Sequence, residues 1–488
     1  MKRCFVCVAV CCLISSMAWA ATGKVLILHT NDLHEHIRAS AGGVGGMPYL
    51  AGYVAAARAE RPGSLLLDSG DVMEKGDMLA YLTKAQAMYE AMNRVGFDAS
   101  APGNHDLAYG LENLRACAKL GGFPLLSINL VDPDNKPIFE TSKIFDVDGV
   151  KVGVIGAITS AYVTNDPKAP ARALEINPTI DLIVEEVKVL DPQCDLLVLL
   201  CHLGSKACLN IAERVPQIDV FLSGHSHERL DVPIVSEASG ALILQTGAFA
   251  SSIGRLDLTV DLGEKRIVES DFELVALDHD TTPLDKELAN WVAEREQEVC
   301  PQAAVVLGHA AREIRGRALA QMFADAIRAK SGAEIAVDSP NMLRATLPAG
   351  PIEYNTVFKA YIPGGRAAVS KREAVLISIK GADLLDYLEK GMAKRGAPAW
   401  VGFAAKADYQ KPEGERVLFS DLEPGRTYQV ALSRVMLTAL ATAIGKKPEA
   451  FEAKGLEFNV IDAMAEKIQA MAAEGAEIGA EEAAAAAN

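Results

Sequence analysis

The sequence predicts a layered α/β domain over residues 21–280, followed by a smaller α+β domain over residues 303–470. In the first segment, short and almost continuous apolar runs alternate with helical stretches. Such runs are typical of strands covered on both faces, as in a β-sandwich flanked by helices. We expect strands at Val25–Leu28, Ser64–Leu67, Leu125–Ile128, Val152–Ile155, Leu196–Leu200, Val220–Leu222 and Ala241–Leu244.

The remaining elements of the first domain have other patterns. Met47–Arg58 and Ala80–Val95 space their apolar residues as helices do, and each is expected to form one helix. Gly254–Asp261 and Asp271–Leu277 alternate apolar and polar residues, which favours antiparallel strands with one exposed face.

A linker helix is expected between the two domains, within residues 281–302. Leu284–Val299 is one amphipathic, charged stretch. The second domain is expected to contain helices at Ala318–Lys330 and Ala382–Lys390 and strands at Ile335–Val337, Ala374–Ile379 and Tyr428–Leu432. The final residues, 471–488, are rich in Ala and Glu and predict a frayed helix or a disordered tail.

Residues 1–20 have the features of an export signal. A basic start at Lys2 and Arg3 precedes an apolar run, Cys4–Ile14, and a small-x-small cleavage pattern ends at Ala20. A membrane anchor is the alternative, but this run is shorter than the roughly 20 residues that span a bilayer. We therefore expect a cleaved signal, a periplasmic or extracellular location, and a mature chain without membrane association.

The composition limits the partners and the disulfide pattern. The formal net charge of -16 repels nucleic-acid backbones, so we expect a small-molecule substrate and no nucleic-acid partner, and we expect a monomer. An acidic protein that handles phosphate has to neutralise it locally, with metals or a few arginines. An odd number of cysteines follows the signal, so at least one thiol should stay free; these are Cys117, Cys194, Cys201, Cys208 and Cys300.

Metal-ligand residues follow several predicted strands. Because the carboxyl ends of such strands meet at one edge of an open α/β sheet, these residues should converge there. Carboxylate, amide and imidazole groups together suit Mn, Zn, Fe, Co or Mg ions. Two such ions can clamp a phosphate ester and lower the pKa of a shared water, giving hydroxide that attacks phosphorus. The candidates are Asp32, His34, Asp71, Asn104, His105, His202, His225 and His227.

Each motif alone is weak, because a lone His-x-His pair or Gly-Asp turn is common. The inference depends on their occurrence in order, with six of the nine histidines in or beside them. Together the motifs resemble the calcineurin-like metallophosphoesterases. Residues Val25 to Ile468 resemble the bacterial periplasmic 5'-nucleotidase / UDP-sugar hydrolase / 2',3'-cyclic phosphodiesterase family.

The resemblance implies roles for individual residues. One ion would be held by Asp32, His34, Asp71 and His227, and the second by Asp71, Asn104, His202 and His225. His105 would face the substrate phosphate and stabilise the transition state or assist the leaving group.

The chain departs from the family pattern beside His105. The family has two acidic residues after this histidine, and the second, which would orient the ring, is Ala108 here. Asp106 matches the first acidic position, and we predict it as a catalytic residue together with His105. Either Asp106 or another group then substitutes for the missing carboxylate, or the enzyme is slower or prefers good leaving groups.

The second domain, which the resemblance implies supplies the substrate pocket, departs further. Arg344 is retained, but the family's base-stacking aromatic is missing at Gly364, and Arg366 stands where the family has asparagine. Arg312 and Arg315 follow the linker. We predict these four arginines as substrate ligands, with a solvated basic face as the alternative for Arg312 and Arg315.

The sequence therefore predicts an exported, dinuclear, metal-dependent phosphoester hydrolase that resembles 5'-nucleotidases and releases phosphate from nucleotides. The altered pocket leaves open a non-nucleotide or cyclic phosphate ester as substrate. A non-catalytic binding protein with a retained metal site is the third alternative, supported only by Ala108.

Overall fold

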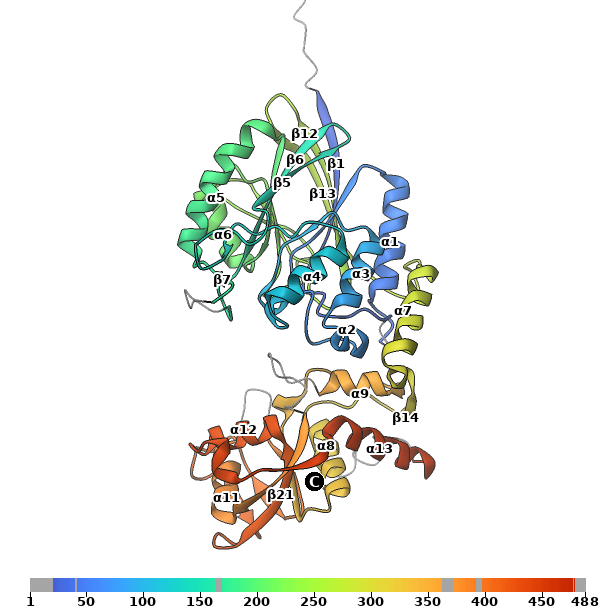
Figure 1. Ribbon diagram of the computed structural model, residues 1–488, viewed down its shortest axis with the longest axis vertical. Coiled ribbons are helices and arrows are strands. Elements are labelled where there is room, and N and C mark those ends of the chain that lie inside the picture. Colours follow the sequence, from blue (N-terminus) through green and yellow to red (C-terminus); the bar gives the residue numbers. More distant parts are fainter. Residues whose placement is uncertain are drawn as a thin grey trace, which may run out of the picture.

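The computed structural model describes residues 21–39, 42–163, 169–361, 372–391, 397–476 and 478. The predicted signal and residues 477 and 479–488 of the Ala/Glu-rich tail lie outside these residues. Along the chain there are two parts, and helix α7 (Lys286–Val299) lies between them in sequence (Figure 1). Asp285 caps α7, because its carboxylate accepts a hydrogen bond from the Leu288 N–H at 2.8 Å. The linker helix is thus present, two residues shorter than the predicted Leu284–Val299.

The first part is built on two sheets. One sheet has the order β13 (Arg266–Ala276), β12 (Ser252–Asp261), β1 (Thr22–Thr30), β2 (Ser64–Asp68) and β3 (Ala99–Ser100). The other has the order β10 (Ile234–Val235), β11 (Leu242–Leu244), β9 (Val220–Ser223), β8 (Leu196–His202), β6 (Val150–Ile158) and β5 (Ser142–Val147). Strands β1, β2 and β3 are parallel, as are β6, β8, β9 and β11. Their carboxyl ends therefore share an edge in each sheet.

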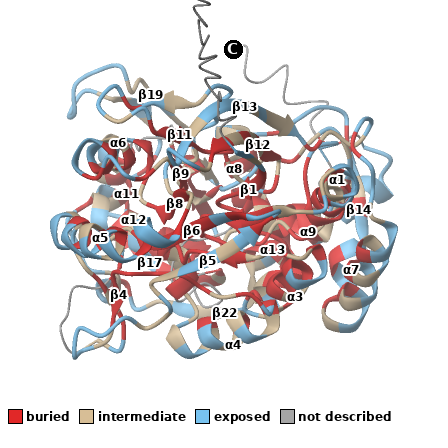
Figure 2. Ribbon diagram, turned by 90° about the horizontal axis from the view of Figure 1, so that it is seen from above, coloured by how far each residue is buried: buried red, intermediate tan, exposed pale blue. Residues whose placement is uncertain are grey.

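Strand β1 shows why these segments are apolar throughout. Successive side chains of a strand point to opposite faces. Val25 and Ile27 pack between the two sheets, whereas Leu26 and Leu28 belong to the core beneath the outer helices. Helix α1 (Met47–Glu60) contributes to that core, and α5 (Ile176–Leu190) and α6 (Ser205–Arg214) cover the other sheet. The predicted β-sandwich flanked by helices is confirmed, and Figure 2 shows its central strands buried and the edge strands β5 and β13 more exposed.

One predicted helix is divided. Ala80–Val95 forms α2 (Met78–Leu82) and α3 (Gln86–Val95) instead of a single helix. Between them Lys84 and Ala85 have left-handed φ angles of 51° and 64°, which a continuous helix excludes. The apolar spacing continues through this turn, so the spacing alone does not reveal the break.

The predicted strand at Leu125–Ile128 is also wrong, because this segment makes only isolated bridges. Its N–H groups donate in turn to the carbonyl groups of Ser100, Glu140 and Gly156, which lie on three different segments. The segment is buried and apolar like a strand, but no single partner strand runs beside it.

The second part has a sheet with the order β18 (Ala399–Val401), β15 (Ile335–Asp338), β21 (Thr427–Ser433), β17 (Glu373–Lys380) and β22 (Lys454–Asn459). One face packs on α11 (Gly381–Lys390) and α12 (Arg434–Ala443), and the other on α8 (Gly316–Ser331) and α13 (Val460–Ala473). This arrangement is the predicted α+β fold. Shorter elements complete the described chain: α4 (Leu111–Gly121), β4 (Leu130–Val131), β7 (Arg172–Ala173), β14 (Val306–Ala310), β16 (Gly350–Glu353), α9 (Tyr354–Ala360), β19 (Ala405–Ala407) and β20 (Val417–Ser420).

The five cysteines of the described chain are buried free thiols. The sulfur atoms of Cys201 and Cys208 are 3.4 Å apart. No helix in the described ranges combines the length and apolar character needed to cross a bilayer.

Candidate metal and phosphoester site

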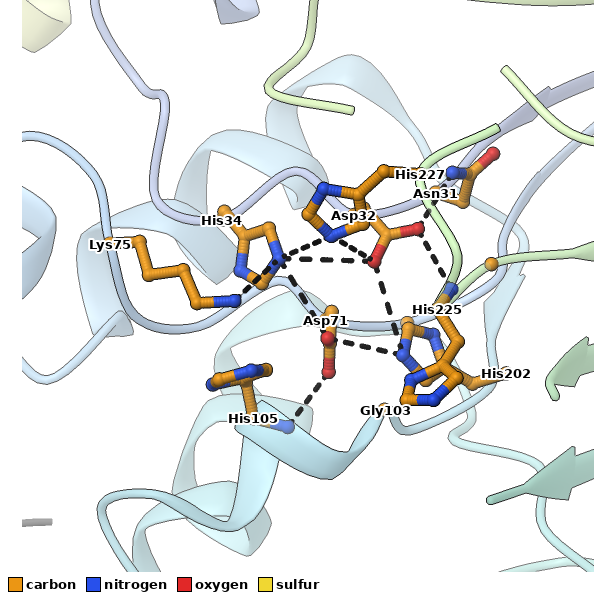
Figure 3. Close-up of polar contacts among 12 residues, drawn as sticks. Asn31, Asp32, His34, Asp71, Lys75, Gly103, His105, His202, His225 and His227 are labelled. Atoms are coloured by element: carbon orange, nitrogen blue, oxygen red, sulfur yellow. Dashed lines mark hydrogen bonds and ion pairs between the residues drawn. The ribbon is translucent and has the colours of Figure 1, made fainter. Parts of the chain in front are cut away.

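The predicted metal ligands converge at the carboxyl ends of the strands of both sheets (Figure 3). Their positions follow from the parallel strands, because each ligand lies at or just beyond the end of one. Asp32 and His34 follow β1, Asp71 follows β2, His202 ends β8, His225 and His227 follow β9, and Asn104 begins a short 3-10 helix, Asn104–Leu107.

Asp32 lies at the centre of this cluster. Its Oδ1 atom is 3.1 Å from Nε2 of His227, 3.8 Å from Nε2 of His34 and 3.9 Å from Nε2 of His202. The Oδ2 atom of Asp71 is 3.1 Å from Nε2 of His202 and 3.8 Å from Nε2 of His34. Each carboxylate therefore reaches histidines of both predicted ligand sets, as expected if a carboxylate bridges two ions.

Asn104 and His225 join the cluster at its other side. Nδ1 of His225 is 3.0 Å from Oδ1 of Asn104, and the His225 N–H donates to Oδ2 of Asp32 at 3.0 Å. The ring centroids of His225 and His202 are 5.3 Å apart. The fold thus brings all the predicted metal ligands together.

The ligand atoms are arranged as if around divalent cations, not as hydrogen-bond partners of one another. Oδ1 of Asp32 and Nε2 of His202 are buried, and neither makes a hydrogen bond within the described residues. Nε2 of His34 and Nε2 of His227 are only 3.1 Å apart. Asp32, His34 and His227 form one compact ligand group, and Asp32, Asp71 and His202 form another. Buried polar atoms left without partners are costly, whereas carboxylate and imidazole donors suit transition-metal ions.

The backbone around the ligands is strained. Asp32, His34, Asp71, His225 and His227 have left-handed φ angles between 45° and 83°. Such conformations cost on the order of 1–3 kcal/mol each for non-glycine residues and cluster at functional sites. The surrounding packing therefore holds the ligands in geometries that the local sequence does not favour.

Two glycines allow the close approach. A Cβ atom on Gly103 would lie 2.2 Å from Oδ1 of Asp71. A Cβ atom on Gly224 would lie 2.8 Å from Nδ1 of His202. The glycines of the Gly-Asn-His and Gly-His-x-His motifs therefore leave the space in which the ligands meet.

Burial and charge set the protonation of the cluster. Burial lowers the pKa of His34 to about 3, so its ring is neutral at pH 7. Burial alone would lower the pKa of His202, but the carboxylates of Asp71 and Asp32 raise it to about 10. Burial alone would raise the pKa of Asp71, but the neighbouring His202 ring holds this pKa well below its usual range. Both central carboxylates are therefore ionised at neutral pH.

His105 lies beside the ligands and is held at two points. Its N–H donates to Oδ1 of Asp71 at 2.8 Å, and its ring Nδ1 is 2.6 Å from Oε2 of Glu74. Its ring centroid is 5.2 Å from that of His34. The structure thus places His105 next to the predicted metal cluster.

The Asp106 carboxylate, predicted as catalytic, is bonded to backbone N–H groups of two loops. Its carboxylate accepts hydrogen bonds from the N–H groups of Gly103 at 2.6 Å, Asp71 at 2.9 Å, Val72 at 2.9 Å and Met73 at 3.0 Å. It is fully buried. Asp106 therefore ties the Asp71 loop to the Asn104 turn, and its predicted catalytic role stays a prediction.

A cleft of about 670 Å³ opens over the cluster, between the two parts of the chain. Its wall includes the ligand His227 and, from the second part, Arg344 and Lys359. Lys75 and Phe249 also line it, and the sequence analysis did not identify them. Nζ of Lys75 is 3.4 Å from Nε2 of His34, and Phe249 is 42% exposed. Neither occurs in a pattern that would have revealed it.

Asp77 connects the two walls of the cleft. Its Oδ1 atom accepts hydrogen bonds from Asn355 at 2.8 Å and from Lys359 at 2.9 Å. The Met78 N–H donates to Oδ1 of Asn355 at 2.8 Å. Arg38 adds an ion pair with Glu353 at 2.7 Å.

The other predicted substrate arginines are placed differently from Arg344. Arg312 and Arg315 are exposed and do not belong to the lining of this cleft. Arg315 is 78% exposed and lies 3.9 Å from Glu313. Arg366 lies outside the described residues. Their role in substrate binding stays a prediction.

Two family models match the chain. The calcineurin-like phosphoesterase model matches residues 25–229, and the 5'-nucleotidase C-terminal domain model matches residues 301–439. The chain belongs to the calcineurin-like phosphoesterases that carry a 5'-nucleotidase C-terminal domain. The predicted family is therefore confirmed.

Known relatives extend over both parts. The chain is 23% identical over 476 residues to Endonuclease YhcR of Bacillus subtilis, covering 86% of this chain but only 38% of that protein. It is 26% identical over 487 residues to Protein UshA of Yersinia enterocolitica, covering 85% of this chain and 86% of that protein. The crystal structure of a 5'-nucleotidase precursor from Thermus thermophilus shares the fold with a TM-score of 0.69 at 22% identity, covering 92% and 97% of the two chains.

Proposed function

We propose that this protein is an exported, dinuclear, metal-dependent phosphoester hydrolase that releases phosphate from nucleotides. One observation carries the proposal: the predicted ligands meet at one edge of the sandwich, beneath a cleft with cationic side chains. Membership of a phosphoesterase family agrees with it. Export through a cleaved signal at residues 1–20, a periplasmic or extracellular location and a monomeric state are part of the same proposal.

The chain's own residues would divide the work. Asp32, His34, Asp71 and His227 would hold one divalent ion, and Asp71, Asn104, His202 and His225 the other, with Mn, Zn, Fe, Co or Mg as candidates. When bound, such ions supply Lewis acidity and a nucleophile derived from water at neutral pH. His105 lies beside these ligands, with its ring centroid 5.2 Å from that of His34, and its ring would face the ester phosphate.

The cleft supports an anionic substrate with an extended leaving group. Lys75 and Arg344 bring positive charge from opposite walls toward the ligand cluster. Guanidinium groups bind phosphate oxygens through paired hydrogen bonds. Phe249 offers a partly exposed aromatic ring near His227, with centroids 5.4 Å apart. Since aromatic rings stack on nucleobases, this residue supports a nucleotide substrate although the family aromatic is missing at Gly364.

Two alternatives remain to be tested against this proposal. A non-nucleotide or cyclic phosphate ester would use the same ions but would gain nothing from Phe249. A non-catalytic binding protein would not need a cluster whose backbone is strained at five ligands.

A matched panel of esters tests the proposal. The purified mature protein is stripped of metal, then assayed with and without Mn on a nucleoside monophosphate, a UDP-sugar, a 2',3'-cyclic nucleotide, a sugar phosphate and an activated aryl phosphate. Mn-dependent turnover of a nucleotide at a rate well above that of the sugar phosphate would support the proposal. Turnover of only the sugar phosphate or the aryl ester would contradict the nucleotide assignment. If no ester shows Mn-dependent turnover, the result would contradict the assignment of the protein as a metal-dependent hydrolase.

A further inference from the structure

The ring of His105 needs a partner that fixes its tautomer and its orientation. A histidine presents one ring nitrogen to a reacting group, and the hydrogen bond made by the other nitrogen decides how it does so. Residue 108 lies one turn after His105, and its N–H donates to the His105 carbonyl at 2.9 Å. Its side chain is only a methyl group. The turn that carries His105 therefore cannot supply an acceptor from this position.

Glu74 reaches the same ring from another loop. Its Oε2 atom is 2.6 Å from Nδ1 of His105. The two side chains are 10% and 23% exposed, so water competes little for this contact. A carboxylate hydrogen bond of this length is strong and directional. It places the proton on Nδ1 and leaves Nε2 as the nitrogen available to a substrate.

The loop that bears Glu74 is fixed at both sides. Val72 and Met73 donate their N–H groups to Asp106, and the Val72 carbonyl accepts from Glu35 at 2.8 Å. The Met73 carbonyl lies 3.1 Å from Nδ1 of His34. Glu74 itself has a left-handed φ of 66°, a conformation that glutamate adopts only when its surroundings impose it. The loop that presents Asp71 to the metal cluster thus also presents Glu74 to His105.

The other nearby carboxylates bond elsewhere, although Oε2 of Glu35 makes no hydrogen bond within the described residues. Asp106 is taken up by backbone N–H groups, and Oε1 of Glu35 accepts the hydroxyl of Tyr109 at 2.8 Å. Oδ1 of Asp71 accepts the His105 N–H, not a ring nitrogen. Glu74 is therefore the carboxylate whose geometry suits the ring.

We propose that Glu74 is the positioning residue that orients His105 for phosphoester hydrolysis, in place of a carboxylate at residue 108. The proposal rests on the proposed function for the reaction that His105 serves. The orientation of the ring does not depend on the proposed function and can be measured separately.

Kinetics give the first readout. Glu74→Ala removes the contact, Glu74→Gln keeps the shape without the charge, and Glu112→Ala is the control, since Glu112 is exposed on the same part of the chain. Both Glu74 variants should lower kcat roughly 10- to 100-fold, as loss of an orienting partner does, while KM stays within about threefold. Adding Ala108→Asp to Glu74→Ala should restore much of the lost kcat. A kcat within about twofold of wild type in both Glu74 variants would overturn the proposal.

The second readout does not depend on activity. Long-range ¹H–¹⁵N spectra of the histidine-labelled mature chain report which ring nitrogen carries the proton, and His105→Asn identifies the signals of His105. We expect Nδ1 to be protonated in the wild type and this preference to be lost in Glu74→Ala. An unchanged His105 spectrum in Glu74→Ala would overturn the proposal. If no ester is turned over, the proposed function fails. The spectrum still decides whether Glu74 fixes the protonated nitrogen of the His105 ring.

Discussion

The metal-ligand edge of the first part and the cleft wall supplied by the second part are built in opposite ways. At the edge, Asp32, His202 and Asp71 are buried, and each ligand is held by contacts on two sides. On the wall, the exposed side chain of Arg344 donates to the carbonyl groups of Asn341 and Leu343 and lines the cleft. Buried and closely held ligands suit bond cleavage, whereas an exposed side chain on the cleft wall suits recognition of a leaving group. Changes at the edge should therefore affect kcat, and changes on the wall should affect KM.

The largest effect is expected from breaking the edge. Asp71→Asn removes a carboxylate that lies 3.1 Å from His202 and 3.8 Å from His34. We expect kcat to fall by more than about 100-fold, because loss of a ligand exceeds the 10- to 100-fold typical of residues one contact further away. The control is Asp219→Asn, a half-buried aspartate before β9 that accepts from the Leu197 N–H at 2.8 Å. Similar kcat values for the two variants in steady-state assays would contradict a special role for Asp71.

A smaller effect of a different kind is expected on the wall. Arg344→Ala should raise KM for a nucleotide about 10-fold or more, because a hydrogen bond to a charged group contributes about 1.5–3 kcal/mol. The value of kcat at saturation should stay close to that of the wild type, since Arg344 is not one of the proposed metal ligands and its side chain donates to carbonyl groups of the second part. Arg426→Ala, an exposed arginine of the second part, is the matched control. A fall in kcat with unchanged KM would erase the distinction between the two regions.

The last effect concerns the pH dependence of stability, not activity. Asp338, at the end of β15, is fully buried and accepts from the Ser339 N–H at 2.7 Å and the Tyr361 hydroxyl at 3.2 Å. Burial raises its pKa to about 8. Between pH 4 and 8 the folded chain therefore binds more protons than the unfolded chain, and stability falls as pH rises, by up to about 1.4 kcal/mol per pH unit.

Asp338→Asn keeps the shape and removes this titration, so its stability should depend less on pH over the same window. Thermal unfolding of wild type, Asp338→Asn and the surface control Asp386→Asn at several pH values checks this. Parallel pH profiles for wild type and Asp338→Asn would contradict it.

The sequence predicted the edge better than the cleft for a physical reason. Each metal ligand follows an apolar strand, and parallel strands bring their ends together whatever the intervening loops do. Asp71 and His202 could therefore be placed near each other from their positions alone. Glu74 could not, because its contact with His105 depends on a left-handed turn that no apolar pattern encodes.

The errors in the fold have a similar origin. Ala80–Val95 keeps helical spacing across a break, and Leu125–Ile128 is apolar without one partner strand. Apolar spacing reports which side chains are buried, and it does not report which backbone groups pair. Asp106 was recognised by its motif, but its bonding to four N–H groups emerges only in the folded chain.

The most direct test of the central claim is a metal titration of the stripped, mature protein. Calorimetry with Mn should show binding of two ions per chain in the wild type, and nucleotide turnover should rise as the sites fill. In Asp71→Asn the binding should weaken at both sites, because each carboxylate at the edge reaches histidines of both ligand sets. Full turnover in protein that binds no divalent ion would contradict the assignment of this edge as a dinuclear catalytic centre.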